Sequence, residues 1–552
     1  MDNSDIIVAM RNKKIPRMHL EIQKSGYKYY GVIRTTFRES GKIRHTTHGT
    51  IKNKSYEELK LLQAALRGDV VIKGSDEAPK ILESKEYGAS YAVMQLAKEL
   101  GLDRAIYSKT SEQWVKDSLA MIVGRLVYSG SKLSLSNRWK DTALWELCGV
   151  DGEVDVEMHC YEAMDRLFQR QGAIQKGLAE RHLKNGSLVL YDITSSYFEG
   201  EYAGSEIVTF GYNRDGKRGH EQMVIGLLCS PEGCPVGVEV FSGNTQDATT
   251  VLEKIAEVQK TYGIQEIIFV GDRGMVTHAN YEKVKDIAGL NTISALTHRQ
   301  IVELLRRKII QIDMFDEREI LEVVDPDKPG RRYCLCRNPR TAVREGKTRK
   351  SLMEVTRKLL DGIAQSKRKW PAEKIAERVG KVLGKTKMGK FVDWEVADGH
   401  LQWKFREDKI EAEELLDGCY IITSDVPLEL MDKQEIVASY KKLGLVEQAF
   451  RNLKSVQLEV RPVYHKTDDR IRCHVFICML SYYLQWHMNQ RLKVLFQADG
   501  KNKHRRWTFE NVIERLKSVR RQTLQIKGSN CRVVSTPDED QQKILNLLQI
   551  RL

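Results

Sequence analysis

The sequence has no apolar stretch long enough to cross a bilayer. Its longest apolar run, around Val475–Leu484, is shorter than the roughly 20 residues that a membrane-spanning helix needs. The first residues, MDNSDIIVAMRNKK, also lack the apolar segment of a signal peptide. We therefore expect a cytoplasmic protein with no membrane partner.

The cysteines follow no recognisable framework. Ten are scattered along the chain. Cys334 and Cys336 are separated by a single residue, which is too close for a zinc knuckle, and Cys229 and Cys234 flank a Pro-Glu-Gly turn. No second Cys or His pair follows at zinc-finger spacing. Reduced thiols, as in cytosolic proteins, are the expectation.

A phosphate-binding loop is missing as well. The stretch Gly380–Thr386 (GKVLGKT) resembles a P-loop, but Val379 stands where the first glycine should be. No buried strand precedes the stretch, as the motif requires. We therefore expect neither an ATPase nor any other nucleotide cofactor.

The charge balance favours a polyanionic partner. The 552 residues include 89 Lys and Arg against 75 Asp and Glu, a formal net charge of +14. Hydrophobic residues make up 41% and charged residues 30%, which indicates a globular chain with room for three or more domains. Nucleic acid is the commonest large polyanion.

Changes of pattern along the chain predict six segments. Alternating residues in Met18–Ile51 predict a small β-unit, whose basic and aromatic residues suit either a phosphate backbone or an ordinary solvated sheet face. Helical periodicity follows, and then mixed strands and helices. The expected segments are an N-terminal β-unit (1–54), an all-α region with DNA binding as its expected role (55–182), a catalytic core in two parts (183–296 and 418–490), an insertion (297–417) and a basic C-terminal tail (491–552).

The core is predicted from five apolar strands. They are Leu188–Thr194, Glu221–Cys229, Pro235–Phe241, Glu266–Val270 and Asn291–Leu296, with helices expected at Asp247–Tyr262 and near Tyr281–Ile287. Three strands, a helix, a strand, a helix and a strand make a mixed α/β sheet that matches the ribonuclease H-like order. The predicted fold class is therefore α/β.

Two carboxylates stand at the ends of these strands. Asp192 interrupts the first, where burying an unpaired charge is costly, and Asp272 follows the fourth within Gly-Asp-Arg-Gly. In the ribonuclease H-like order these strands are neighbours, so the two aspartates should lie side by side and repel unless a cation lies between them. Mg²⁺ or Mn²⁺ fits such oxygen ligands. Alternatively, each Asp is structural, Asp192 beginning a turn with Thr194 and Ser195.

The insertion is strongly basic. Its Lys and Arg residues include Arg340, Arg344, Lys347, Arg349, Lys350, Arg357, Lys367, Arg368 and Lys369, followed by Trp370. A basic surface with interleaved aromatics fits a nucleic-acid groove. A solvated helical face is the alternative.

A helix is predicted at Tyr440–Ser455. Leu443, Val446, Phe450 and Leu453 form its apolar stripe. Tyr440, Glu447 and Lys454 recur every seven residues and drift only about 20° per step, so they share one face. Glu447 could complete a three-carboxylate metal site, and Tyr440 and Lys454 could hold a phosphate. Taken alone, Glu447 fits an exposed helix position.

Together these motifs resemble the DDE transposases of bacterial insertion sequences, in the family-four-like branch with a Y-R-E-K signature. The motifs are Leu190–Ser195 (LYDITS), Phe269–Gly274 (FVGDRG) and Tyr440…Glu447…Lys454. Two further segments also resemble the family, Gly211–Leu228 and Val238–Asp247. The resemblance runs from about Gly88 to Gln485.

The resemblance implies a ribonuclease H-like catalytic domain that cuts and joins double-stranded DNA at terminal inverted repeats and target sites. It implies two divalent ions held by Asp192, Asp272 and Glu447, a homodimer on paired DNA ends, and a location on the bacterial nucleoid. Tyr440 and Lys454 would lie near the terminal phosphate of a DNA hairpin. The signature arginine falls at Leu443, so Arg451 is the candidate to replace its phosphate contact.

Two other functions remain open at this point. One is a different ribonuclease H-like nuclease, which the insertion and both accessory regions argue against. The other is a transposase-derived DNA-binding protein without catalysis, which the three intact carboxylates argue against.

Overall fold

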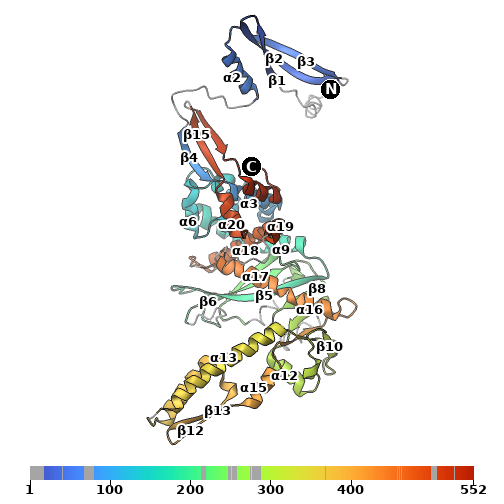
Figure 1. The fold of residues 1–552 in the computed structure, drawn as a ribbon, viewed down its shortest axis with the longest axis vertical. Coiled ribbons are helices and arrows are strands. Elements are labelled where there is room, and N and C mark those ends of the chain that lie inside the picture. Colours follow the sequence, from blue (N-terminus) through green and yellow to red (C-terminus); the bar gives the residue numbers. More distant parts are fainter. Residues whose placement is uncertain are drawn as a thin grey trace. The chain divides into compact units, whose positions relative to one another are not determined.

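A computed structural model describes most of the chain. The described residues are 18–39, 42–67, 80–212, 219–246, 250, 258–273, 275, 287–366, 368–456, 458, 460–461, 463–498, 506–526 and 529–552. They fall into two compact units, one of residues 1–83 with 523–532 and the other of residues 84–522 with 533–552. The elements of both are labelled in Figure 1.

The first unit contains the β-unit predicted from the sequence. Strands β1 (Met18–Ser25), β2 (Lys28–Glu39) and β3 (Lys42–Ile51) form an antiparallel sheet. Gly26, at φ 58°, occupies the two-residue turn between β1 and β2, where glycine relieves the steric cost of a left-handed backbone. Helix α2 (Tyr56–Arg67) packs against β1.

Residues 84–182 are mainly helical, as expected. The helices are α3 (Gly88–Glu99), α4 (Leu102–Ile106), α5 (Gln113–Val127), α6 (Lys132–Asn137), α7 (Leu144–Leu147), α8 (Glu162–Gln169) and α9 (Gln171–His182). The prediction that 55–182 is all helical is wrong at one place. Strand β4 (Lys80–Glu86) forms a sheet with β15 (Arg520–Ile526) and β16 (Ser529–Val534). A pairing across more than 430 residues leaves no local pattern.

An eight-stranded sheet organises the second unit. Its order is β10-β11-β14-β9-β8-β5-β6-β7. The predicted strands are β5 (Ser187–Tyr197), β6 (Gln222–Cys229), β7 (Pro235–Ser242), β8 (Ile267–Gly271) and β9 (Leu290–Ala295). Strands β5, β8 and β9 run parallel, and β6 runs antiparallel between β5 and β7. This is the ribonuclease H-like arrangement. The helices expected at Asp247–Tyr262 and Tyr281–Ile287 lie mostly outside the described residues.

The insertion contributes to this sheet, which the sequence did not predict. Strand β11 (Arg332–Arg337) pairs antiparallel with β14 (Cys419–Ser424), and β10 (Leu321–Val324) pairs antiparallel with β11. The apolar residues of β11 are buried despite the arginines at its ends. The remaining elements are α12 (His298–Arg306), α13 (Pro339–Ala364), α14 (Ala372–Thr386), β12 (Val392–Ala397), β13 (His400–Phe405) and α15 (Glu407–Glu414). The P-loop-like stretch Gly380–Thr386 lies within helix α14.

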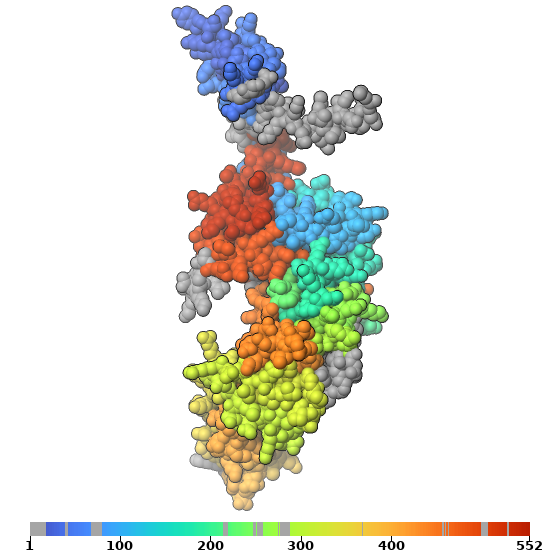
Figure 2. Space-filling view, turned by 90° about the vertical axis from the view of Figure 1, so that its right-hand side faces the viewer, coloured from blue at the N-terminus to red at the C-terminus, as the bar shows by residue number. Residues whose placement is uncertain are grey.

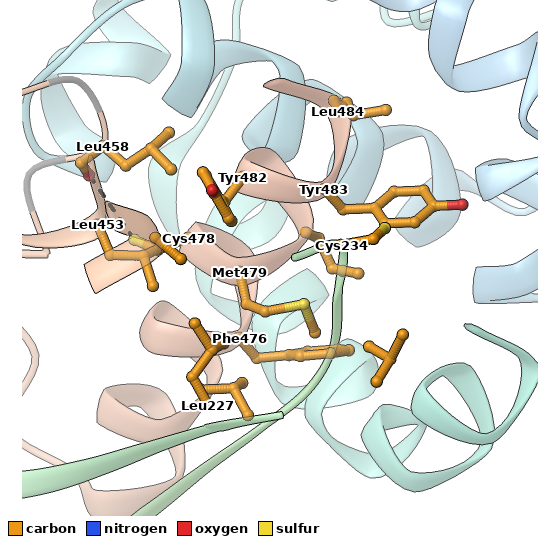
Figure 3. Packing of buried hydrophobic residues seen from close by; sticks show 14 of the residues in the cluster. Leu227, Cys234, Leu453, Leu458, Phe476, Cys478, Met479, Tyr482, Tyr483 and Leu484 are labelled. Atoms are coloured by element: carbon orange, nitrogen blue, oxygen red, sulfur yellow. Dashed lines mark hydrogen bonds between the residues drawn. The ribbon is translucent and has the colours of Figure 1, made fainter. Parts of the chain in front are cut away.

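Helix α18 (Asp468–Arg491) forms the centre of the core. It packs against β7, α5 and α8. Its predicted apolar segment is fully buried, and Phe476 lies beside Leu227 from the sheet, with Met479 next to it (Figure 3). The other C-terminal helices are α16 (Lys433–Lys441), α17 (Leu443–Arg451), α19 (Lys493–Ala498), α20 (Phe509–Lys517) and α21 (Glu539–Leu548).

The C-terminal residues are part of the second unit's core rather than only a basic tail. Helices α20 and α21 pack against α3, so the red C-terminal surface adjoins the light-blue surface of the early helices (Figure 2). Val512, Leu516 and Leu548 are buried there. Among the described residues, no helix is long and apolar enough to cross a membrane.

Candidate active site

Asp192 lies in the middle of a buried strand. On β5 it pairs with Leu227 of β6, and its neighbour Tyr191 pairs with Gly271 at the end of β8. The Asp192 side chain is half-buried, and its Oδ1 accepts a hydrogen bond of 2.8 Å from the backbone N–H of Ile193. That bond orients the carboxylate without neutralising it.

Asp272 follows directly after β8. Because Tyr191 and Gly271 are register partners on parallel strands, Asp192 and Asp272 occupy neighbouring positions, as predicted. The prediction that both stand at strand ends is wrong for Asp192, because β5 continues to Tyr197. Ser294 on β9 donates a hydrogen bond of 3.2 Å to the backbone carbonyl of Asp272. The side chain of Asp272 is exposed, so it is available to a ligand arriving from solvent.

Tyr440 contacts the second aspartate. Its hydroxyl, at the end of α16, donates a hydrogen bond of 3.2 Å to Asp272 Oδ1. Burial raises the pKa of Tyr440 well above its usual value, and the negative charges of Asp272 and Asp192 raise it further, while Arg273 opposes them. The hydroxyl therefore stays protonated at neutral pH and remains a donor.

Glu447 lies on a helix that packs over the first aspartate's strand. Helix α17 contacts β5 and β6, and it buries Leu443, Val446 and Phe450 as the predicted stripe requires. Glu447 itself is exposed. Leu443, at the signature arginine position, is only 7% exposed and belongs to the core, so this position makes no phosphate contact.

The predicted continuous helix is interrupted twice. Residue 442 separates α16 from α17, and a π-helical turn, Asn452–Val456, follows α17. Lys454 is half-buried within that turn, and Arg451 is exposed at the end of α17. The single helix predicted at Tyr440–Ser455 is therefore the end of α16, helix α17 and a π-turn, so Tyr440 and Glu447 stand on different helices.

Of the predicted site residues, Tyr440 and Asp272 are in direct contact, and Asp192 lies on the adjacent strand. Within the part of the chain that the structure describes, Asp192, Asp272 and Glu447 do not form a group with ligand atoms all within 4.8 Å of one another. Their oxygen donors are nonetheless the hard ligands that Mg²⁺ and Mn²⁺ prefer.

The residues 185–484 match the family model described as "Transposase DDE domain", which covers more than half of the chain. The chain belongs to this family. No curated protein matches it. Among solved structures, it is similar to a chain described as "Cryo-EM structure of piggyBac transposase synaptic complex with hairpin DNA (SNHP)". That likeness has 8% identity and a TM-score of 0.35 over 78% of this chain and 76% of the other, and it carries no functional argument.

A cavity beside the transposase-domain carboxylates was missed by sequence reasoning. It measures about 400 Å³, and Arg273 and Tyr440 line it together with residues of the insertion such as Asn338 and Arg349. Arg273, next to Asp272, is exposed. Its place in the Gly-Asp-Arg-Gly motif was the available signal, because a cation beside two carboxylates can contact a phosphate.

The basic surface of the transposase insertion is confirmed only in part. Most of the predicted residues on α13 are exposed, whereas Lys367 lies outside the described residues. Trp370 has Arg368, Lys374 and Arg378 within 4.7–5.5 Å of its ring centre. The exception is Arg349, which is 8% exposed. It cannot belong to a DNA-facing surface, because its guanidinium donates to Asp417 Oδ1 at 3.0 Å.

Replacing Arg349 with Ala should lower the free energy of unfolding by about 3 kcal/mol, because the half-buried Asp417 would lose its cationic partner. Urea unfolding monitored by hydrogen exchange in α13 would measure the loss. Arg344→Ala, on an exposed position of the same helix, is the matched control and should change stability by less than about 0.5 kcal/mol. Equal effects of the two changes would contradict a structural role for the Arg349–Asp417 pair.

Proposed function

We propose that this chain is a DNA transposase of a bacterial insertion sequence, in the Y-R-E-K branch of the family. The observation that carries the proposal is the position of Asp192 on β5 and of Asp272 directly after the neighbouring parallel strand β8, with the Tyr440 hydroxyl hydrogen-bonded to Asp272. Family membership supports the same reaction class. The reaction is cleavage of the element's ends followed by strand transfer into target DNA.

The proposed metal ligands are Asp192, Asp272 and Glu447. Two divalent ions held there would supply activation of the attacking oxygen and stabilisation of the leaving oxygen during in-line displacement at phosphorus. Asp192 is the candidate shared ligand, because its strand, β5, pairs with β8, which leads to Asp272, and also contacts α17, which carries Glu447. Tyr440 holds Asp272 in position.

DNA binding is proposed for three parts of the chain. The helical region of 55–182 would contact the element's ends. The exposed Lys and Arg residues of α13, with Trp370 and its three cations, offer phosphate contacts and an aromatic surface. Arg451 and Lys454 would contact phosphate near Glu447. We propose a homodimer on paired ends, since strand transfer joins two DNA ends.

The experiment that tests this function measures strand joining. Labelled element-end DNA and a supercoiled plasmid would be incubated with the full chain and Mg²⁺, and joined products separated by size. Joining that requires Mg²⁺ and is abolished by EDTA is expected. End cleavage without joining would favour another ribonuclease H-like nuclease. Binding of the ends with neither reaction would favour a non-catalytic DNA-binding protein.

Replacing Tyr440 with Phe should slow end cleavage by about 10- to 100-fold, the usual cost of losing a hydrogen bond to a metal ligand. The ring keeps its packing, so folding should not change. Single-turnover cleavage rates would measure the effect, with Tyr464→Phe as the control because Tyr464 is 63% exposed. A Tyr440→Phe enzyme as fast as wild type would show that the bond to Asp272 is dispensable.

A further inference from the structure

Two histidines and a cysteine, whose nitrogen and sulfur atoms are softer metal donors than carboxylate oxygens, meet at one place in the second unit. His182 ends α9, Cys234 lies in the turn between β6 and β7, and His487 lies near the end of α18. Their ligand atoms all lie within 4.8 Å of one another. Figure 3 shows Cys234 beside Tyr483 of α18. Three segments far apart in the sequence thus bring metal-binding side chains to one place.

One of the three candidate metal ligands has a buried ring nitrogen without a hydrogen-bond partner among the described residues. His182 Nε2 lies 3.1 Å from the Tyr483 hydroxyl and 3.9 Å from Cys234 Sγ. His487 Nε2 is buried and, among the described residues, has no hydrogen-bond partner. An unsatisfied buried polar atom costs about 1–3 kcal/mol, and an ion is one of the causes that account for such an atom.

The electrostatic surroundings keep the imidazoles neutral. Burial lowers the pKa of His182 and lowers that of His487 to about 4. Arg181 and Arg491 act in the same direction, whereas Glu232 raises the pKa of His182 and Glu99 that of His487. Neutral imidazoles present the lone pairs that a metal needs.

We propose that His182, Cys234 and His487 bind a Zn²⁺ ion. Two imidazoles and a thiolate are a zinc donor set, and zinc's bond lengths place tetrahedral N and S ligands roughly 3.5 Å apart, close to the 3.9 Å between His182 Nε2 and Cys234 Sγ. The Tyr483 hydroxyl, 3.1 Å from His182 Nε2, would give up its hydrogen bond to that nitrogen when the ion binds. On loading, the Cys234 S–H bond breaks, its proton goes to solvent, and the sulfur bonds to the ion without any change of oxidation state.

The ion would fasten α9 and α18 to the turn between β6 and β7. That turn supports the helix of the proposed catalytic glutamate, because Gly233 lies against Leu445 of α17 so closely that a Cβ would come within 2.9 Å of Leu445 Cβ. The zinc site is therefore structural, and it stabilises the position of α17 on the sheet. It is separate from the oxygen ligands proposed for Mg²⁺, and it does not depend on the proposed function.

Metal content and cobalt spectroscopy of the purified full chain would test this site. We expect stoichiometric zinc in the wild type and, after exchange with Co²⁺, a thiolate-to-cobalt charge-transfer band. Cys234→Ala and His487→Gln should each reduce bound metal by at least about tenfold, as expected for the loss of a ligand. Cys229→Ala removes an equally buried cysteine of β6 outside the group and should keep the band.

The stability of the wild-type chain with and without zinc tests the site even if the variants fail to fold. Adding Zn²⁺ to the EDTA-treated wild type should raise its urea unfolding midpoint, because a ligand that binds only the folded state stabilises it, and Mg²⁺ should not. The proposal is overturned if the wild type neither retains zinc nor gains stability from it. It is also overturned if the cobalt band persists in a folded Cys234→Ala variant.

Discussion

Asparagine in place of Asp192 should reduce DNA-end cleavage about a thousandfold, while binding of the same DNA is retained. The loss follows from the proposed role, because metal ions contribute several kcal/mol of transition-state stabilisation and each 1.4 kcal/mol is about tenfold in rate. Asparagine keeps the side-chain oxygen that accepts the Ile193 N–H, so the strand should be undisturbed. Single-turnover cleavage with Mg²⁺ and an electrophoretic binding assay would measure the two quantities.

Asp151→Asn makes the same chemical change at an exposed position and should cleave like the wild type. If Asp192→Asn also cleaves like the wild type, Asp192 is a structural residue and the proposed metal site is wrong. If Asp192→Asn loses DNA binding together with cleavage, its role lies in DNA recognition or folding, and thermal unfolding of the variant would distinguish these two.

Alanine in place of Phe476 should lower the free energy of unfolding by about 3–5 kcal/mol, the range for removing a large buried aromatic side chain. Phe476 is completely buried on α18, and that helix packs on β7 as well as on α5 and α8. The cavity would therefore weaken the attachment of the early helices and of the sheet together. A fall in the urea midpoint with an unchanged slope would measure it.

Val494→Ala provides the comparison, because Val494 on α19 is 67% exposed. Its effect should stay within about 0.5 kcal/mol. If Phe476→Ala unfolds in two separate transitions, one for the helices and one for the sheet, α18 does not couple them as its packing indicates. If it shifts the midpoint no more than Val494→Ala, the packing around Phe476 is not part of a cooperative core.

The core strands could be predicted because a buried strand appears in the sequence as a short run of apolar residues. Residues 188–191 and 267–270 are continuous apolar runs, as strands covered on both faces require. Their placement as neighbours was predicted from the ribonuclease H-like order of elements, which also predicted that Asp192 and Asp272 lie near each other. Strand β4 left no such pattern, since only its penultimate residue is buried.

The basic insertion shows that the sequence does not distinguish exposed arginines from buried, ion-paired ones. Arg344 and Arg349 look equivalent in a run of cations, yet one is exposed on α13 and the other is buried against Asp417. The partner lies 68 residues away, so nothing local distinguishes them. Leu443 differs from them, because the apolar stripe already placed it in the core, and its burial excludes a phosphate contact.

The sequence by itself determined the α/β class, strands β5 to β9 of the central sheet and the apolar stripe of α17, because local patterns of apolar and charged residues carry these features. Tertiary structure alone decided the addition of β10 and β11 to the sheet, the hydrogen bond from Tyr440 to Asp272, and the proximity of His182, Cys234 and His487. Each of these joins segments distant in sequence, and the contacts depend on how helices and strands pack rather than on the residues beside them.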